Sequence, residues 1–81
     1  MFYFVYILRS EKDKKFYIGF TTDVNRRFIQ HNSGEVESTK NRWPLELIFY
    51  EAFRSKNAAL KREKYFKTTK GKLALKYMLK G

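Results

Sequence analysis

The stretch from Phe2 to Leu8 is apolar at all of its seven positions, and this continuity constrains the fold more than any other feature of the chain. Aromatic and β-branched residues dominate it, which favours a β-strand, and a strand without a polar face needs cover on both sides. It is too short to span a membrane, and neither a basic segment nor a small-residue cleavage site flanks it as in a signal peptide. We therefore expect a buried, central strand.

Strand and helix patterns alternate along the rest of the chain. Strands are predicted at residues 2–8, 16–20 and 45–53, and the first two are expected to be antiparallel because a short polar turn joins them. Helices are predicted from about residue 24 to 32 or 33, from 56 to 67 and from 70 to 79. The proposed N-caps are Thr22 or Asp23, Ser55, and Thr68 or Thr69, and Gly34 ends the first helix.

The last two helices are expected to be separate, because Thr68-Thr69-Lys70-Gly71 makes a poor helix interior. Glycine alone costs about 1 kcal/mol there relative to alanine. The order strand, strand, helix, strand, helix, helix predicts an α+β fold, in which about three helices flank a three-stranded antiparallel sheet. A chain of 81 residues has room for one small domain, so we expect a single domain over residues 1–81.

The chain is strongly basic, with 18 Lys and Arg against 8 Asp and Glu and a formal net charge of +10. Such a surface attracts polyanions, and nucleic acid is the first candidate partner. The alternative is a basic surface that serves solubility alone. Cysteine is absent, which excludes disulfides and thiolate metal sites and suits a reducing, cytoplasmic location. With one histidine, His-rich zinc sites are excluded as well.

The first predicted helix carries Arg27 and His31, which are four residues apart and lie on one border of its apolar stripe. Both can lean over the edge of the sheet, where the first two strands present Tyr6 and Tyr17. Phosphate chemistry needs a proton acceptor and a cation, and this group offers both. The alternative is a solvated arginine and a histidine that interacts favourably with the helix C-terminus.

The second predicted helix places Glu63 on the same arc as Ala59 and Phe66, so its carboxylate points inward. An unpaired buried charge costs several kcal/mol, which makes a bound cation the expected compensation. A lone carboxylate favours Mg²⁺ that keeps most of its waters. The alternative is that the buried arc lies elsewhere and Glu63 pairs with Lys67 in water.

Several of these segments together resemble the GIY-YIG nucleases. The matching segments are Val5-Tyr6, Tyr17-Ile18-Gly19, the turn and helix from Thr21 to Arg27, and Glu63 within residues 59–67. Residues 31–34 and 42–48 are most similar to the small stand-alone UPF0213 branch, which is similar in turn to the N-terminal nuclease domain of a DNA-repair excinuclease.

The resemblance implies a one-metal phosphodiesterase, an endonuclease that hydrolyses nucleic acid, with DNA favoured over RNA and DNA repair as the setting. In this family pattern Tyr6 or Tyr17 acts as general base or positions the attacking water, and His31 takes the proton. Arg27 holds the scissile phosphate, and Glu63 binds Mg²⁺ or Mn²⁺. No membrane is expected as a partner.

Two positions depart from the family pattern. Phe4 stands where the first motif has glycine, and residues 68–81 lack the Asn that many catalytic members carry after the glutamate helix. The alternatives are therefore a catalytically weak or inactive nucleic-acid-binding module, and a nuclease subunit whose specificity comes from a protein partner.

Overall fold

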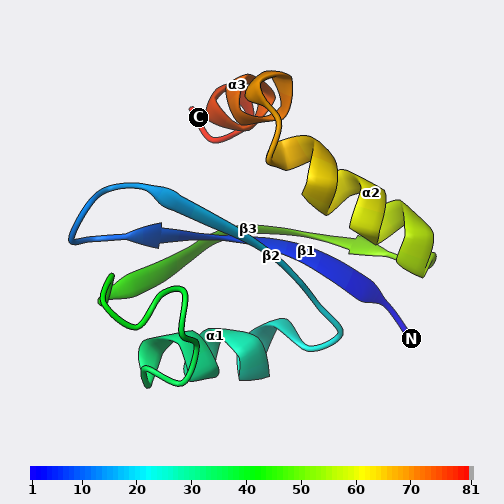
Figure 1. Ribbon diagram of the computed structural model, residues 1–81. Helices are drawn as coiled ribbons and strands as arrows, with labels where there is room; N and C mark the ends of the chain where they lie inside the picture. Colours follow the sequence, from blue (N-terminus) through cyan, green and yellow to red (C-terminus); the bar gives the residue numbers. More distant parts are fainter. Residues whose placement is uncertain (81) are drawn as a thin grey trace.

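The computed structural model, which describes residues 1–80, is built around a three-stranded antiparallel sheet with helices on both faces (Figure 1). Helix α1 covers one face, and α2 and α3 lie over the other (Figure 1). The predicted α+β fold is confirmed. The elements are β1 (Tyr3–Ser10), β2 (Phe16–Thr21), α1 (Val24–Asn32), β3 (Leu45–Phe53), α2 (Lys56–Phe66) and α3 (Thr69–Met78).

Strand β1 is the centre of the sheet, in the order β2-β1-β3. Its side chains alternate between two buried clusters: Val5 and Ile7 pack under α2 and α3, whereas Tyr6 and Leu8 pack toward α1. The expectation of cover on both faces is thus confirmed. The strand runs two residues beyond the predicted end because Ser10 still pairs with β3, opposite Leu45.

A register shift in β3 changes which face its residues supply. Ile7 pairs with Phe49 and Leu8 with Leu47, so Ile48 is an extra residue. Ile48 and Phe49 consequently both join the cluster under α2 and α3, while Leu47 joins the cluster near α1. A bulge of this kind lets one edge strand contribute to two cores.

Each helix begins at a side-chain cap. The caps accept a hydrogen bond from the backbone N–H three residues further on, which satisfies a donor that the first helical turn leaves unpaired. They are Asp23, Ser55 and Thr68, all among the predicted candidates. None of the helices within residues 1–80 is long and apolar enough to span a lipid bilayer.

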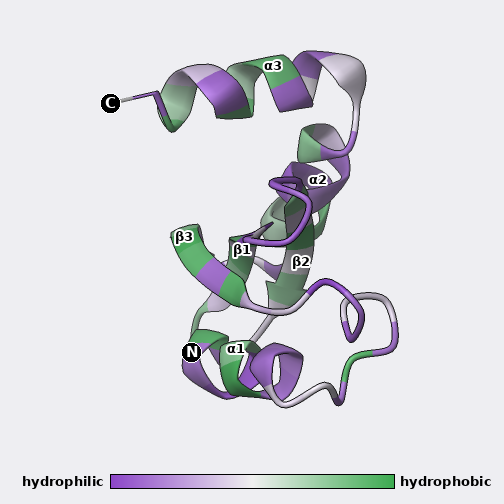
Figure 2. Ribbon diagram, turned by 90° about the vertical axis from the view of Figure 1, so that its left-hand side faces the viewer, coloured by the Kyte–Doolittle hydropathy of each residue, from purple (hydrophilic) through white to green (hydrophobic). Residues whose placement is uncertain are grey.

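Helices α2 and α3 are separate, as predicted, and they meet at Gly71. This buried glycine is so close to α2 that a Cβ at its position would overlap the Tyr65 carbonyl. Only glycine permits this approach, and α3 then continues at an angle to α2 (Figure 2).

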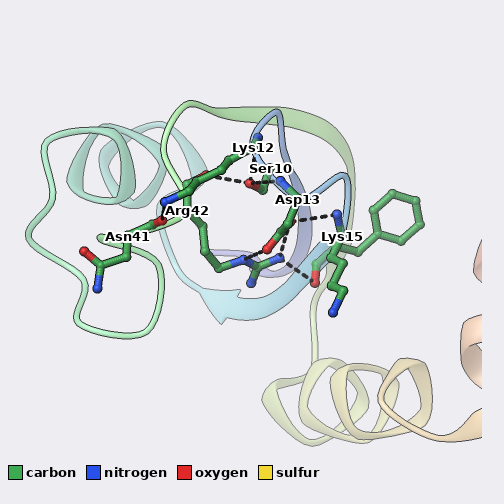
Figure 3. A network of polar contacts seen from close by, with 7 residues as sticks. Ser10, Lys12, Asp13, Lys15, Asn41 and Arg42 are labelled. Carbon is green, nitrogen blue, oxygen red and sulfur yellow. Dashed lines mark hydrogen bonds and ion pairs between the residues drawn. The ribbon is translucent and has the colours of Figure 1, made fainter.

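The loop between α1 and β3 passes beside α1 (Figure 2) and is tied to the β1–β2 turn. Arg42 Nε donates to Asp13 Oδ2 over 3.0 Å, and the Ser10 hydroxyl donates to the Arg42 carbonyl over 2.6 Å (Figure 3). These contacts join segments about 30 residues apart in the chain. They hold both the turn and the loop in place.

Candidate active site

Tyr6, Tyr17, Arg27 and His31 meet on the face of the sheet that α1 covers. The Tyr6 hydroxyl lies 2.8 Å from His31 Nε2, and Arg27 Nε donates to the same hydroxyl over 3.3 Å. The Tyr17 ring packs edge-on against His31, with 4.8 Å between ring centroids. The spacing of Arg27 and His31 on α1 thus brings both side chains to one phenol, and we call these four residues the tyrosine cluster.

Tyr6 is nearly inaccessible to solvent, and its environment controls its ionisation. Its partner in the sheet register is Gly19, which leaves space for the ring to lie over β2. Burial raises the pKa of Tyr6 to about 12, although the hydrogen bond from Arg27 acts in the opposite direction. The phenol is therefore neutral at pH 7 and available as a hydrogen-bond donor.

His31 is completely buried and bonded at both ring nitrogens. Nε2 faces Tyr6, and Nδ1 lies 2.7 Å from the hydroxyl of Thr39. Burial, followed by the positive charge of Arg27, lowers the pKa of His31 to about 4, so the ring is neutral at pH 7. When Nδ1–H donates to Thr39, Nε2 accepts the Tyr6 proton, and the opposite tautomer reverses both bonds.

Thr39 is the residue of this group that sequence reasoning missed. It is fully buried, yet it lies in a polar loop with no periodicity. The loop brings it back to His31, and no local pattern marks one threonine in such a segment. The ties between this loop and the β1–β2 turn, made by Ser10 and Arg42, help to hold it there.

A polar hollow of about 380 Å³ opens beside the tyrosine cluster. Two arginines, Arg26 and Arg27, line it with one carboxylate, Asp23, and Gln30 accepts a hydrogen bond from Arg27 Nη1 over 3.1 Å. Two guanidinium groups beside a shallow polar surface suit a phosphate group. The hollow is therefore the place where a phosphodiester can reach Arg27.

Glu63 comes from a different layer of the molecule than the tyrosine cluster. It belongs to α2, which packs on the opposite face of the sheet because Ala59 and Phe66 cover Val5 and Ile7. Four of the five predicted site residues are therefore brought together by direct contact, and Glu63 is not one of them.

The surroundings of Glu63 combine features of both sequence interpretations. The Glu63 side chain is only 21% exposed, which agrees with the predicted inward orientation. Its Oε2 also lies 3.4 Å from Lys67 Nζ, which agrees with the alternative prediction that Glu63 pairs with Lys67. Within residues 1–80 no three His, Cys, Asp or Glu side chains gather into a metal cage. A single carboxylate with a displaceable lysine partner fits a hydrated Mg²⁺ ion, which commonly takes one carboxylate and substrate oxygens.

The fold is that of a nuclease-type domain family. A family model described as the GIY-YIG catalytic domain matches residues 2–77, and the chain belongs to the GIY-YIG family.

The relatives place the chain in the UPF0213 branch. A UPF0213 protein of Staphylococcus epidermidis is 41% identical over 80 residues, which is 98% of this chain and 96% of the relative. One from Haloquadratum walsbyi is 41% identical over 68 residues, 83% of this chain and 75% of the relative. The solution NMR structure of a UPF0213 protein from Bacillus halodurans is 37% identical, with a TM-score of 0.60 over 96% of this chain and 85% of that one.

Proposed function

We propose that the chain is a metal-dependent endonuclease that hydrolyses phosphodiester bonds in nucleic acid, with DNA favoured as substrate. The observation that carries this proposal is the convergence of Arg27 and His31 on the hydroxyl of Tyr6. One buried phenol thereby has a cation and a neutral imidazole within hydrogen-bonding distance. These are the groups that phosphate hydrolysis needs for charge stabilisation and proton transfer.

In this proposal the scissile phosphate binds in the hollow against Arg27, and the attacking water is held by the Tyr6 hydroxyl. The water gives a proton to Tyr6 as Tyr6 gives its own to His31 Nε2, while the new P–O bond forms and the leaving P–O bond breaks. A bound phosphate offsets the positive charge of Arg27, one of the two causes that lower the pKa of His31. Substrate binding therefore makes His31 a better proton acceptor.

Glu63 would hold the Mg²⁺ or Mn²⁺ ion, together with water. When bound, such an ion supplies positive charge that stabilises the leaving oxygen. The high pKa of Tyr6 also argues against a free phenolate as the base and in favour of the relay through His31. Tyr17, whose ring packs edge-on against His31, orients the imidazole.

The test is cleavage of labelled single-stranded, duplex, flap and junction DNA, and matching RNA, with Mg²⁺, Mn²⁺ or EDTA. We expect cleavage with either metal and none with EDTA. Arg27→Ala should abolish cleavage, whereas Arg54→Ala, which removes an exposed arginine outside the hollow, should retain it. Absence of metal-dependent cleavage on every substrate would refute the proposal.

The second candidate function is a nucleic-acid-binding module without catalysis. The position of α2 on the face opposite the tyrosine cluster favours it, because Glu63 then approaches the phosphate hollow from another layer. Salt-sensitive binding without cleavage in the same assay would select it. A nuclease that depends on a protein partner would instead cleave only after addition of a cell extract.

We also propose that the protein acts in the cytoplasm and that residues 1–81 form a single domain.

A further inference from the structure

A second cavity, of about 410 Å³, lies on the face of the sheet opposite the tyrosine cluster, between the β1–β2 turn and helix α3. Four lysines surround it: Lys14 and Lys15 from the turn, and Lys72 and Lys76 from successive turns of α3. Its lining residues Phe16, Ile18 and Leu75 belong to the core on the face of the sheet that α2 and α3 cover. We call it the lysine cavity.

The floor of the lysine cavity is apolar. Ile18 and Leu75 belong to the buried core, and Phe16 is only partly covered. A ring at the floor of a cationic cavity provides a surface on which a planar base can stack. The lining thus combines an aromatic surface with a rim of positive charge.

The charge of the cavity is largely uncompensated. Among the residues that the structure describes, no acidic side chain lines it. Lys14 pairs with Glu11 over 3.1 Å, but Lys15, Lys72 and Lys76 have no ion-pair partner within residues 1–80. Three like charges from segments far apart in the chain repel one another, and a bound anion removes that repulsion.

One wall of the cavity is preorganised. The β1–β2 turn is held by the Arg42–Asp13 ion pair, and Asp13 Oδ1 also accepts a hydrogen bond from the Lys15 backbone over 2.9 Å (Figure 3). The turn therefore presents Lys15 and Phe16 in one conformation, and little ordering is required on binding.

We propose that the lysine cavity binds unpaired nucleotides of a nucleic-acid strand, with lysines on the phosphates and a base stacked at Phe16. The proposal rests on the proposed function in taking nucleic acid as the ligand. A duplex keeps its bases stacked inside and cannot place one in the cavity, so a single strand is the matching form. An acidic peptide satisfies the lysines but brings no planar base. The cavity would anchor the substrate on the face opposite the site of cleavage.

The experiment measures binding of a fluorescein-labelled oligothymidylate by anisotropy in EDTA, so that no cleavage occurs. The test variant is Lys72→Ala/Lys76→Ala, and the matched control is Lys56→Ala/Lys64→Ala, which removes two exposed lysines of α2 outside the cavity. Both variants lose the same net charge, and thermal unfolding verifies their fold. We expect Kd to rise about tenfold or more for the test pair and about two- to threefold for the control.

Salt dependence and stacking provide two further measurements. If both lysines contact phosphates, the slope of log Kd against log salt should fall by about 1.4 for the test pair, since each single-strand contact contributes about 0.7. Phe16→Leu preserves apolar volume but removes the stacking ring, and should weaken binding about five- to tenfold for the single strand and not for a duplex. Equal losses in the test and control pairs, or equal competition by polyglutamate of the same charge, would overturn the proposal.

These outcomes are separable from those of the proposed function. Arg27→Ala tests the proposed function, since it should abolish cleavage in Mg²⁺, whereas Lys72→Ala/Lys76→Ala tests the lysine cavity by its binding in EDTA. Cavity-dependent binding without any cleavage in Mg²⁺ would contradict the proposed nuclease activity alone. If the wild-type protein cleaves nucleic acid and the Lys72→Ala/Lys76→Ala variant binds the oligonucleotide normally, only the proposal for the lysine cavity is contradicted.

Discussion

Gly19 lies directly against the phenol ring of Tyr6, so closely that a Cβ at Gly19 would overlap the end of that ring and its hydroxyl. The two residues are register partners on adjacent strands. The third residue of the Tyr17-Ile18-Gly19 motif therefore has a steric function: it leaves the space that Tyr6 occupies to reach Arg27 and His31.

Gly19→Ala should displace Tyr6 and destabilise the protein by about 1–3 kcal/mol, the usual cost of overpacking. We expect loss of the Tyr6–His31 hydrogen bond, visible as a change in the His31 ring signals by NMR, and loss of nuclease activity. Gly34→Ala is the control. Its φ of 78° makes alanine unfavourable there too, but a Cβ added at Gly34 would have nothing within 4 Å, so the His31 ring signals should change much less than in Gly19→Ala.

Thr39→Val should remove the partner of His31 Nδ1 while preserving the shape of the side chain. A buried unpaired N–H costs about 1–3 kcal/mol, so we expect stability to fall and the His31 tautomer to shift toward protonated Nε2. Nitrogen-15 shifts of the imidazole measure this directly. Thr39→Ser retains a hydroxyl and should keep the wild-type tautomer of His31. Identical imidazole spectra for Thr39→Val and Thr39→Ser would show that the Thr39 hydroxyl does not control the His31 tautomer.

The stability of the protein should decrease between about pH 6.5 and pH 4. The pKa of His31 is near 6.5 in the unfolded chain and about 4 in the folded one, so the unfolded state binds more protons in this window. The stabilisation is present above pH 6.5 and is lost as the pH falls, on the order of 2–3 kcal/mol. Urea unfolding at several pH values measures it, and a His31→Gln variant should lack this slope.

Glu63→Gln should abolish Mn²⁺ binding and metal-dependent cleavage. The fold should survive, because the lost partner, Lys67, is exposed and such ion pairs contribute less than about 1 kcal/mol. Electron paramagnetic resonance measures free Mn²⁺, and Glu37→Gln is the control because it also removes a carboxylate with a nearby lysine partner. Mn²⁺ binding that is equal in both variants and the wild type would leave Glu63 as a structural partner of Lys67.

The features that the sequence predicts correctly depend on neighbours in the chain. The caps at Asp23, Ser55 and Thr68 act over three residues, and Arg27 and His31 share a helix face because of their spacing. The continuous apolar run at β1 likewise identifies the centre of the sheet.

The features that sequence reasoning missed depend on distant partners. Thr39 is buried because a loop folds back to His31, and the shift at Ile48 depends on how β3 pairs with β1. The layer that Glu63 occupies depends on which face of the sheet α2 covers, and helix periodicity gives the buried arc without identifying the face.

Gly71 has a consequence that extends beyond the crossing of α2 and α3. Lys72 and Lys76 follow it on α3, so the angle at which α3 leaves α2 determines how far their ammonium groups are from Lys14 and Lys15. Any side chain at position 71 would collide with the Tyr65 carbonyl, and the collision would change the angle between α3 and α2. The absence of a Cβ at Gly71 thus determines the width of the opening between Lys14 and Lys15 on the turn and Lys72 and Lys76 on α3.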